Sequence, residues 1–93
     1  MDIKVKHDQE YQQFTVDLGT QNAELAYAKP SSDVLNFTHT FVPAPARGKG
    51  LANELIEAGL NFARENNFQV IASCPVVARY IREHDTYQDL LAK

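Results

Sequence analysis

The stretch Arg47-Gly48-Lys49-Gly50-Leu51-Ala52 lies where the pattern of this sequence changes from strands to a helix. Just before it, Pro43-Ala44-Pro45 cannot continue a strand, because proline lacks the amide hydrogen that a strand ladder needs. From Gly50 to about Asn66, apolar residues recur with a helical period and the opposite side is polar. We therefore predict an amphipathic helix that begins directly at a Gly-rich turn.

The residues before this turn form four runs in which apolar and polar side chains alternate, which is typical of strands with one buried face. The runs are residues 2–7, 14–18, 22–29 and 34–42. Short turns between them predict an antiparallel meander. In the fourth run, the alternation places Leu35, Phe37, His39 and Phe41 on one face.

The residues after the helix predict one more strand and a second helix. Asn66-Asn67 is expected to stop the first helix, because asparagine tolerates the left-handed conformation. Residues 69–74 form a short apolar strand, and Pro75 suits the first turn of a helix over 76–83. Residues 86–91 add a last helical turn with Asp85 as its cap.

This order predicts the fold class. A strand–helix–strand crossover places its two strands parallel, so the strands over 34–42 and 69–74 should run in the same direction. The prediction is an α/β protein: a mixed sheet of about five strands with two main helices, forming a single domain over residues 1–93.

Composition narrows the function. The net charge of −3 argues against a nucleic-acid partner, which needs clustered Lys and Arg. No apolar run approaches the roughly 20 residues that span a bilayer, so we expect no membrane association. The first six residues contain no long apolar core and no small-residue cleavage site, so we expect no secretory signal. Cys74 is the single cysteine, which excludes an internal disulfide and predicts a reducing, cytoplasmic location. A homodimer would add burial to so small a core.

The Gly-rich turn has the features of an anion site. The first amides of a helix have no internal partners and lie at its positive end. Glycines allow a ligand to approach the backbone closely, and Arg47 and Lys49 add positive charge. Neither the P-loop pattern nor the dinucleotide fingerprint is present. The alternative interpretation is a tight turn that carries two solvated cations.

The sequence around the turn also resembles that of a known protein family. Arg47-x-x-Gly50-x-Ala52 is similar to the Arg/Gln-x-x-Gly-x-Gly/Ala motif of the GNAT superfamily of N-acetyltransferases. Two further stretches, 39–43 and 74–84, resemble its small GNAT-like (YidJ-type) members, so the resemblance covers about residues 35–87. One departure is Asp85, where that group commonly has proline after the histidine.

The resemblance implies acetyl-CoA as acyl donor. Its pyrophosphate would rest on the amides of Gly48 to Ala52, and its pantetheine arm would lie along the strand edge at Phe41-Val42. The thioester would then point between that strand and the one ending at Cys74. The residues expected to contact the cofactor are Phe41, Val42, Arg47, Gly48, Lys49, Gly50, Leu51, Ala52 and Tyr80.

Two residues are candidates for acyl-transfer chemistry. Cys74 precedes a helix start, where a thiol can have a lowered pKa and become nucleophilic. His39 is expected to lie near enough to serve as its base. The alternatives are that Cys74 is a small core residue and that His39 is a hydrogen-bonded core residue. Tyr80 is a candidate acid for the leaving thiolate or else a packing residue, and the other histidines show no spacing for a metal site.

Two functions follow. The first is an acetyl-CoA-dependent N-acetyltransferase that acts on an unidentified amine, either by direct attack or through acetyl-Cys74, with a backbone amide near Val42 stabilising the oxyanion. The second is a non-catalytic module on a degenerate GNAT fold that binds coenzyme A or acyl-CoA. The small size of the chain favours the second, because little protein remains to form an acceptor pocket.

Overall fold

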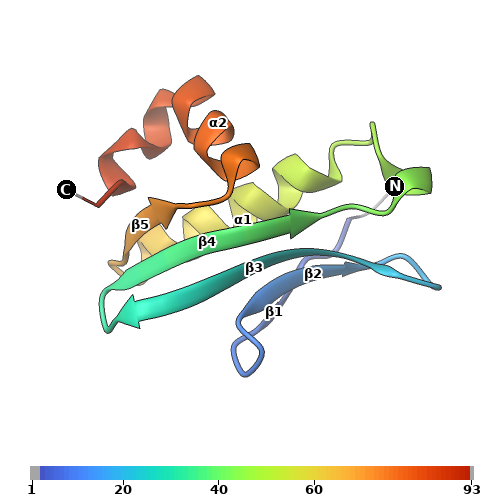
Figure 1. Ribbon diagram of the computed structural model, residues 1–93, viewed down its shortest axis with the longest axis horizontal. Helices are drawn as coiled ribbons and strands as arrows, with labels where there is room; N and C mark the ends of the chain where they lie inside the picture. The colour runs from blue at the N-terminus through green and yellow to red at the C-terminus, as the bar shows by residue number, and fades with distance from the viewer. Residues whose placement is uncertain (1–2, 93) are drawn as a thin grey trace.

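The computed structural model describes residues 3–92, so Met1, Asp2 and Lys93 lie outside the described residues. One sheet contains five strands in chain order (Figure 1): β1 (Lys6–Asp8), β2 (Gln13–Asp17), β3 (Asn22–Ser31), β4 (Val34–Phe41) and β5 (Gln69–Ala72). The first three pairings are antiparallel, and β4 pairs with β5 in parallel. The predicted α/β fold with a mixed sheet is therefore confirmed.

Two α-helices and two short 3₁₀ helices complete the chain: η1 (Ala44–Ala46), α1 (Leu51–Glu65), α2 (Pro75–Glu83) and η2 (Asp85–Leu90). Positive φ angles at Gly50 (79°) and Asn67 (60°) flank α1, as expected for its start and stop. The prediction of Asp85 as a cap is wrong. Asp85 is the first residue of η2, and His84 precedes it with no capping side-chain bond.

All five strands differ from their predicted limits, β2 and β4 by a single residue at an end and the other three by two residues or more. The strand over 2–7 is shorter: ladder pairing begins only at Lys6, although Ile3 and Val5 still pack against the core, and residue 2 lies outside the described residues. β3 extends through Pro30 because a register irregularity there removes the need for a proline amide. β5 ends at Ala72, and Cys74, predicted as the last strand residue, is instead the N-cap residue before α2.

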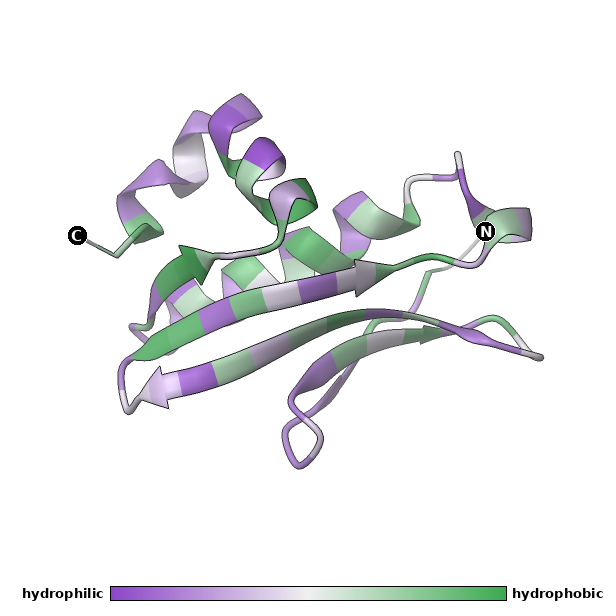
Figure 2. Cartoon of the chain, viewed as in Figure 1, coloured by the Kyte–Doolittle hydropathy of each residue, from purple (hydrophilic) through white to green (hydrophobic). Residues whose placement is uncertain are grey.

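The core lies between the sheet and α1. Hydrophobic and hydrophilic residues alternate in the first half of β4 (Figure 2). Its buried residues, Leu35 and Phe37, belong to the core, where Phe37 packs against Gly59 of α1. The buried side of α1 consists of Leu51, Leu55, Ile56, Gly59, Leu60 and Ala63. Gly59 sits at the closest approach: a Cβ there would lie 2.9 Å from the Phe37 ring and 3.0 Å from Leu25. The sheet and α1 therefore pack at a distance that only glycine permits.

We expect Gly59→Ala to destabilise the protein even though alanine favours helices by about 0.5–1 kcal/mol over glycine. The new methyl group would displace the fully buried Phe37 ring, and overpacking of this kind costs about 1–3 kcal/mol. Urea unfolding of both proteins would measure the difference. Ala58→Gly, one position away and only partly buried, is the control for helix propensity alone. A stabilised Gly59→Ala variant would contradict this account of the packing.

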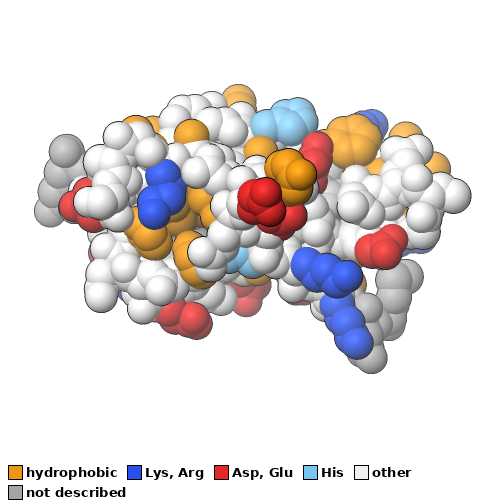
Figure 3. Space-filling view, turned by 90° about the horizontal axis from the view of Figure 1, so that it is seen from below, with side chains coloured by type: hydrophobic (Ala, Val, Ile, Leu, Met, Phe, Trp, Pro, Cys, Tyr) orange, Lys and Arg blue, Asp and Glu red, His pale blue; other side chains and the backbone are white. Residues whose placement is uncertain are grey.

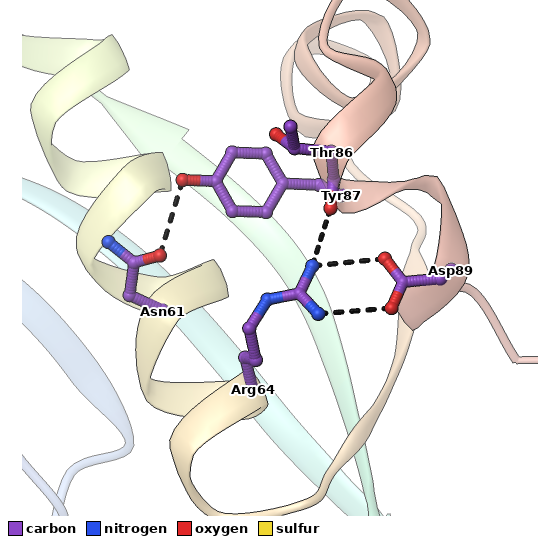
Figure 4. Close-up of polar contacts among 5 residues, drawn as sticks. All are labelled: Asn61, Arg64, Thr86, Tyr87 and Asp89. Atoms are coloured by element: carbon purple, nitrogen blue, oxygen red, sulfur yellow. Dashed lines mark hydrogen bonds and ion pairs between the residues drawn. The ribbon is translucent and has the colours of Figure 1, made fainter.

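The segment after α2 is attached to α1 by polar contacts (Figure 4). Arg64 of α1 forms a bidentate ion pair with Asp89, with both nitrogen–oxygen distances 3.0 Å, and also donates to the Thr86 carbonyl. The Tyr87 hydroxyl donates to Asn61 at 3.2 Å. These contacts fix η2 against α1 and so help to hold α2, which carries Cys74 at its start.

Candidate functional site

The two parallel strands separate before β4 ends. Their last paired residues are Phe37 and Ala72, and one further bond joins the Cys74 amide to the Phe37 carbonyl at 2.9 Å. β4 then continues to Phe41, while the chain after β5 turns away into α2 (Figure 1). Within residues 3–92, no strand pairs with this edge of β4 beyond Phe37. The edge can therefore accept an extended ligand as an additional strand.

A cavity of about 320 Å³ lies where this free edge meets the start of α1. Seven of the nine residues predicted to contact the cofactor line it: Phe41, Val42, Arg47, Gly48, Gly50, Leu51 and Ala52. The lining also includes Thr40, Ala46, Asn53 and Val76, which the sequence interpretation did not include. Thr40, Ala46 and Asn53 directly adjoin predicted contact residues in the sequence and could have been found from that position, whereas Val76 is brought there only by folding.

The backbone of the turn suits a phosphate. Gly48 and Gly50 have φ angles of 82° and 79°, and nothing lies within 4 Å of a Cβ built at either position. The first bond of α1 runs from the Glu54 amide to the Gly50 carbonyl at 3.1 Å. The amides of residues 51–53 therefore have no partner within the helix, and these same residues line the cavity. Amides at a helix start attract anions.

The two cations of the turn are placed differently. Arg47 lines the cavity, and its Nε donates to the Val42 carbonyl at 2.9 Å, which ties the turn to the end of β4. Lys49 instead lines a neighbouring hollow formed with the β2–β3 turn and the proline loop. Arg47 is thus the cation of the predicted anion cradle that the structure brings to the cavity.

Cys74 lies inside the molecule at the start of α2, with 5% of its surface exposed. Its Sγ lies 3.4 Å from the Thr40 hydroxyl. Burial by itself would raise the thiol pKa, but hydrogen bonding from Thr40 and the nearby amides of Val77 and Val76 outweighs it and lowers the pKa. The cap itself has no side-chain bond of ordinary geometry, so these amides act at longer range. A lowered pKa favours the reactive thiolate.

His39 and Phe41 do not share the face of Leu35 and Phe37, which corrects the sequence-based expectation. Ala26 pairs with His39 and Tyr27 pairs with Phe37, so Thr38 is an extra residue, a β-bulge, in β4. The bulge shifts the alternation by one residue. Thr40 then lies opposite the buried Leu25, and His39 is exposed on the other face. Thr40, and not His39, is therefore the β4 side chain that contacts Cys74.

Tyr80 lies on α2 beside a second hollow of about 700 Å³, which shares Asn53 and Val76 with the first cavity. Its ring stacks on His84 with centroids 3.9 Å apart, and only 8% of the residue is exposed. Burial, and then the negative charge of Glu57 and other nearby acidic groups, raises the pKa of Tyr80. The hydroxyl thus stays protonated at neutral pH, in a hollow adjoining the one that Cys74 approaches through Thr40.

Charges elsewhere are mixed. The view in Figure 3 shows acidic and basic side chains dispersed over one surface with hydrophobic groups between them.

Among residues 3–92, no three His, Cys, Asp or Glu side chains gather as metal ligands would. In the same part of the chain, no helix combines the length and the apolar character that crossing a bilayer requires.

Comparisons with known proteins agree with one another on the family to which the chain is similar. Residues 13–90 match the family model described as GCN5-related N-acetyl-transferase. Protein NATD1 of Gallus gallus and of Homo sapiens are each 33% identical to the chain over 90 residues, which is 95% of this chain and 82% and 80% of theirs. The NMR solution structure of a GCN5-like protein from Staphylococcus aureus is similar, with a TM-score of 0.77, 29% identity and coverage of 97% of this chain and 88% of that one.

A crossover with splayed parallel strands and a Gly-rich helix start thus defines an acyltransferase-type fold in this chain. The chain belongs to the GCN5-related N-acetyltransferase family.

Proposed function

We propose that the protein transfers the acetyl group of acetyl-CoA to an amine. The observation that carries this proposal is the cavity at the end of β4, which joins a free strand edge to unpartnered helix amides. A pantetheine arm carries amide groups that can bond a strand edge, and a pyrophosphate needs amide donors and positive charge. The strand edge adjoins the helix amides, just as the pantetheine arm adjoins the pyrophosphate in coenzyme A.

The residues fit coenzyme A in the following way. The amides of Leu51, Ala52 and Asn53 would hold the pyrophosphate together with Arg47. Phe41 and Val42 would contact the pantetheine arm, which directs the thioester into the gap between β4 and the start of α2. Lys49 and Tyr80 would contribute from the adjoining hollows.

Different side chains border the gap on the two faces of the sheet. Cys74 lies on the face of α1, where its thiolate would attack the thioester carbon, and the sulfur of coenzyme A would leave with its bonding electrons and take up a proton. An amide near Val42 would stabilise the negative oxygen. In the second step the amine would attack the acetyl carbon of acetyl-Cys74, the bond to the Cys74 sulfur would break, and the thiolate would be regenerated. His39 lies on the opposite face, where it would accept the proton of the amine. The protonated Tyr80 would be the acid for the departing thiolate.

We expect acetyl-CoA to raise the melting temperature of the protein, because a ligand that binds only the folded state stabilises it by about 2.7 kcal/mol at 100 times its Kd. For a domain of this size, each kcal/mol corresponds to roughly 4–8 °C. ATP supplies phosphates without a pantetheine arm and should give a much smaller shift. Equal shifts with ATP and acetyl-CoA, or no shift at millimolar acetyl-CoA, would refute the proposed donor.

Release of free thiol from acetyl-CoA in the presence of an amine panel separates a transferase from a module that only binds the donor. The second candidate is a module of the same fold that binds the donor without turnover. Thermal stabilisation by acetyl-CoA without thiol release for any amine would support the binding module.

A further inference from the structure

The bulge in β4 determines which side chain faces the only cysteine of the chain. Without Thr38 as an extra residue, strict alternation would direct His39 toward α1, as the sequence pattern predicts. With it, Thr40 lies on the buried face opposite Leu25. Because of the bulge, the neutral hydroxyl of Thr40 lies beside Cys74 instead of the ionisable imidazole of His39.

Thr40 connects the thiol to the cavity. Its Oγ1 lies 3.4 Å from the Cys74 Sγ, and the same residue lines the cavity at the end of β4. The Cys74 backbone is held independently, because its amide donates to the Phe37 carbonyl at 2.9 Å. The backbone bond fixes where the cysteine is, and the side-chain contact fixes where its sulfur points.

We propose that Thr40 is the positioning residue for Cys74: its hydroxyl orients the sulfur toward the end of β4 and donates a hydrogen bond to the thiolate. A catalytic role for the Thr40–Cys74 contact rests on the proposed acyl transfer, whereas the contact itself is present without a ligand. Thr40 touches Cys74 and not the reacting carbon, so it acts through the thiol.

The surroundings of the thiol explain why one hydroxyl matters. Burial opposes the thiolate, and the groups that favour it are all neutral: the Thr40 hydroxyl and the amides of Val77, Val76 and Thr40. Within the described residues, no charged side chain of β4, β5 or α1 is among the influences on the pKa of Cys74. From β4, His39 faces the other way, and Tyr80, the next titratable group buried on α2, borders a different hollow. A hydrogen bond to a buried charge is among the stronger polar contacts.

The experiment measures the rate at which iodoacetamide alkylates the protein as a function of pH, with the intact mass as readout. Cys74 is the only cysteine, so the reaction reports this thiol alone. We expect Thr40→Val, which replaces the hydroxyl by a methyl group of similar size, to move the pH midpoint upward by about one unit. Thr40→Ser should restore the midpoint, and His39→Gln should leave it unchanged.

The midpoint is the decisive quantity, because a change in exposure alters the rate at every pH without moving it. Thr40→Ala provides a second hydroxyl-free variant if Thr40→Val melts too low to be assayed. A wild-type midpoint in the hydroxyl-free variants would overturn the proposal, as would an upward shift in His39→Gln equal to that of Thr40→Val. Absence of acetyl-CoA binding together with the expected midpoint shifts would refute the proposed function and leave the role of Thr40 intact.

Discussion

Gly50→Asp is expected to weaken binding of coenzyme A by at least about a hundredfold relative to Gly50→Asn. Residue 50 lines the cavity next to the amides that would hold the pyrophosphate, so a carboxylate there would repel it. Two like unit charges about 4 Å apart near a protein surface repel each other by roughly 4 kcal/mol, and a loss of about 2.7 kcal/mol already corresponds to a hundredfold weaker Kd. Calorimetric titration of both variants with coenzyme A would measure the ratio.

The pair is matched because Asp and Asn have nearly the same shape and both tolerate the left-handed backbone that Gly50 adopts. A Cβ at this position meets nothing within 4 Å, so neither side chain disturbs the packing. The strain of the non-glycine backbone is common to both variants and cancels in the comparison. Equal affinities would mean that the phosphates bind elsewhere.

Cys74→Ala is expected to lower the turnover of acetyl-CoA with amine by roughly a hundredfold or more while retaining binding of the cofactor, if the thiol is the nucleophile. The wild-type protein incubated with acetyl-CoA alone should then gain the mass of one acetyl group, placed on Cys74 by peptide mapping. Binding should persist because the proposed phosphate contacts come from the Gly-rich turn and not from α2. Stopped-flow thiol release and intact-mass measurement are the two readouts.

Cys74→Ser is the matched variant, since it keeps a side chain of similar size that can still accept the Thr40 hydrogen bond. It should bind coenzyme A normally and show the same loss of turnover, because an alcohol is a far weaker nucleophile than a thiol whose pKa is lowered. Full activity in Cys74→Ala would exclude the acetyl-cysteine route. Direct attack by the amine, with His39 as the candidate base on the open face, would then be the mechanism to test.

Local chemistry made several features predictable. Helix α1 begins after Gly50 and ends before Asn67 because both residues have positive φ angles, which few other residue types tolerate. The proline loop ends β4, and the Gly-rich turn borders the cavity because the first amides of any helix are unpartnered. These features depend on a few neighbouring residues, so they could be read without knowledge of the rest of the chain.

The placement of individual side chains depended on pairing between distant strands. The period-two pattern of β4 assigns His39 to the buried face, but the extra residue Thr38 exists only relative to the register with β3. Likewise, Lys49 and Tyr80 lie beside hollows next to the main cavity because of how the proline loop and α2 pack. The order of the elements and the location of the Gly-rich turn follow from local backbone preferences, so both could be predicted from the sequence. That Thr40 and not His39 faces Cys74 depends on the folded sheet, because a bulge is a relation between two strands and leaves no signal in either strand alone.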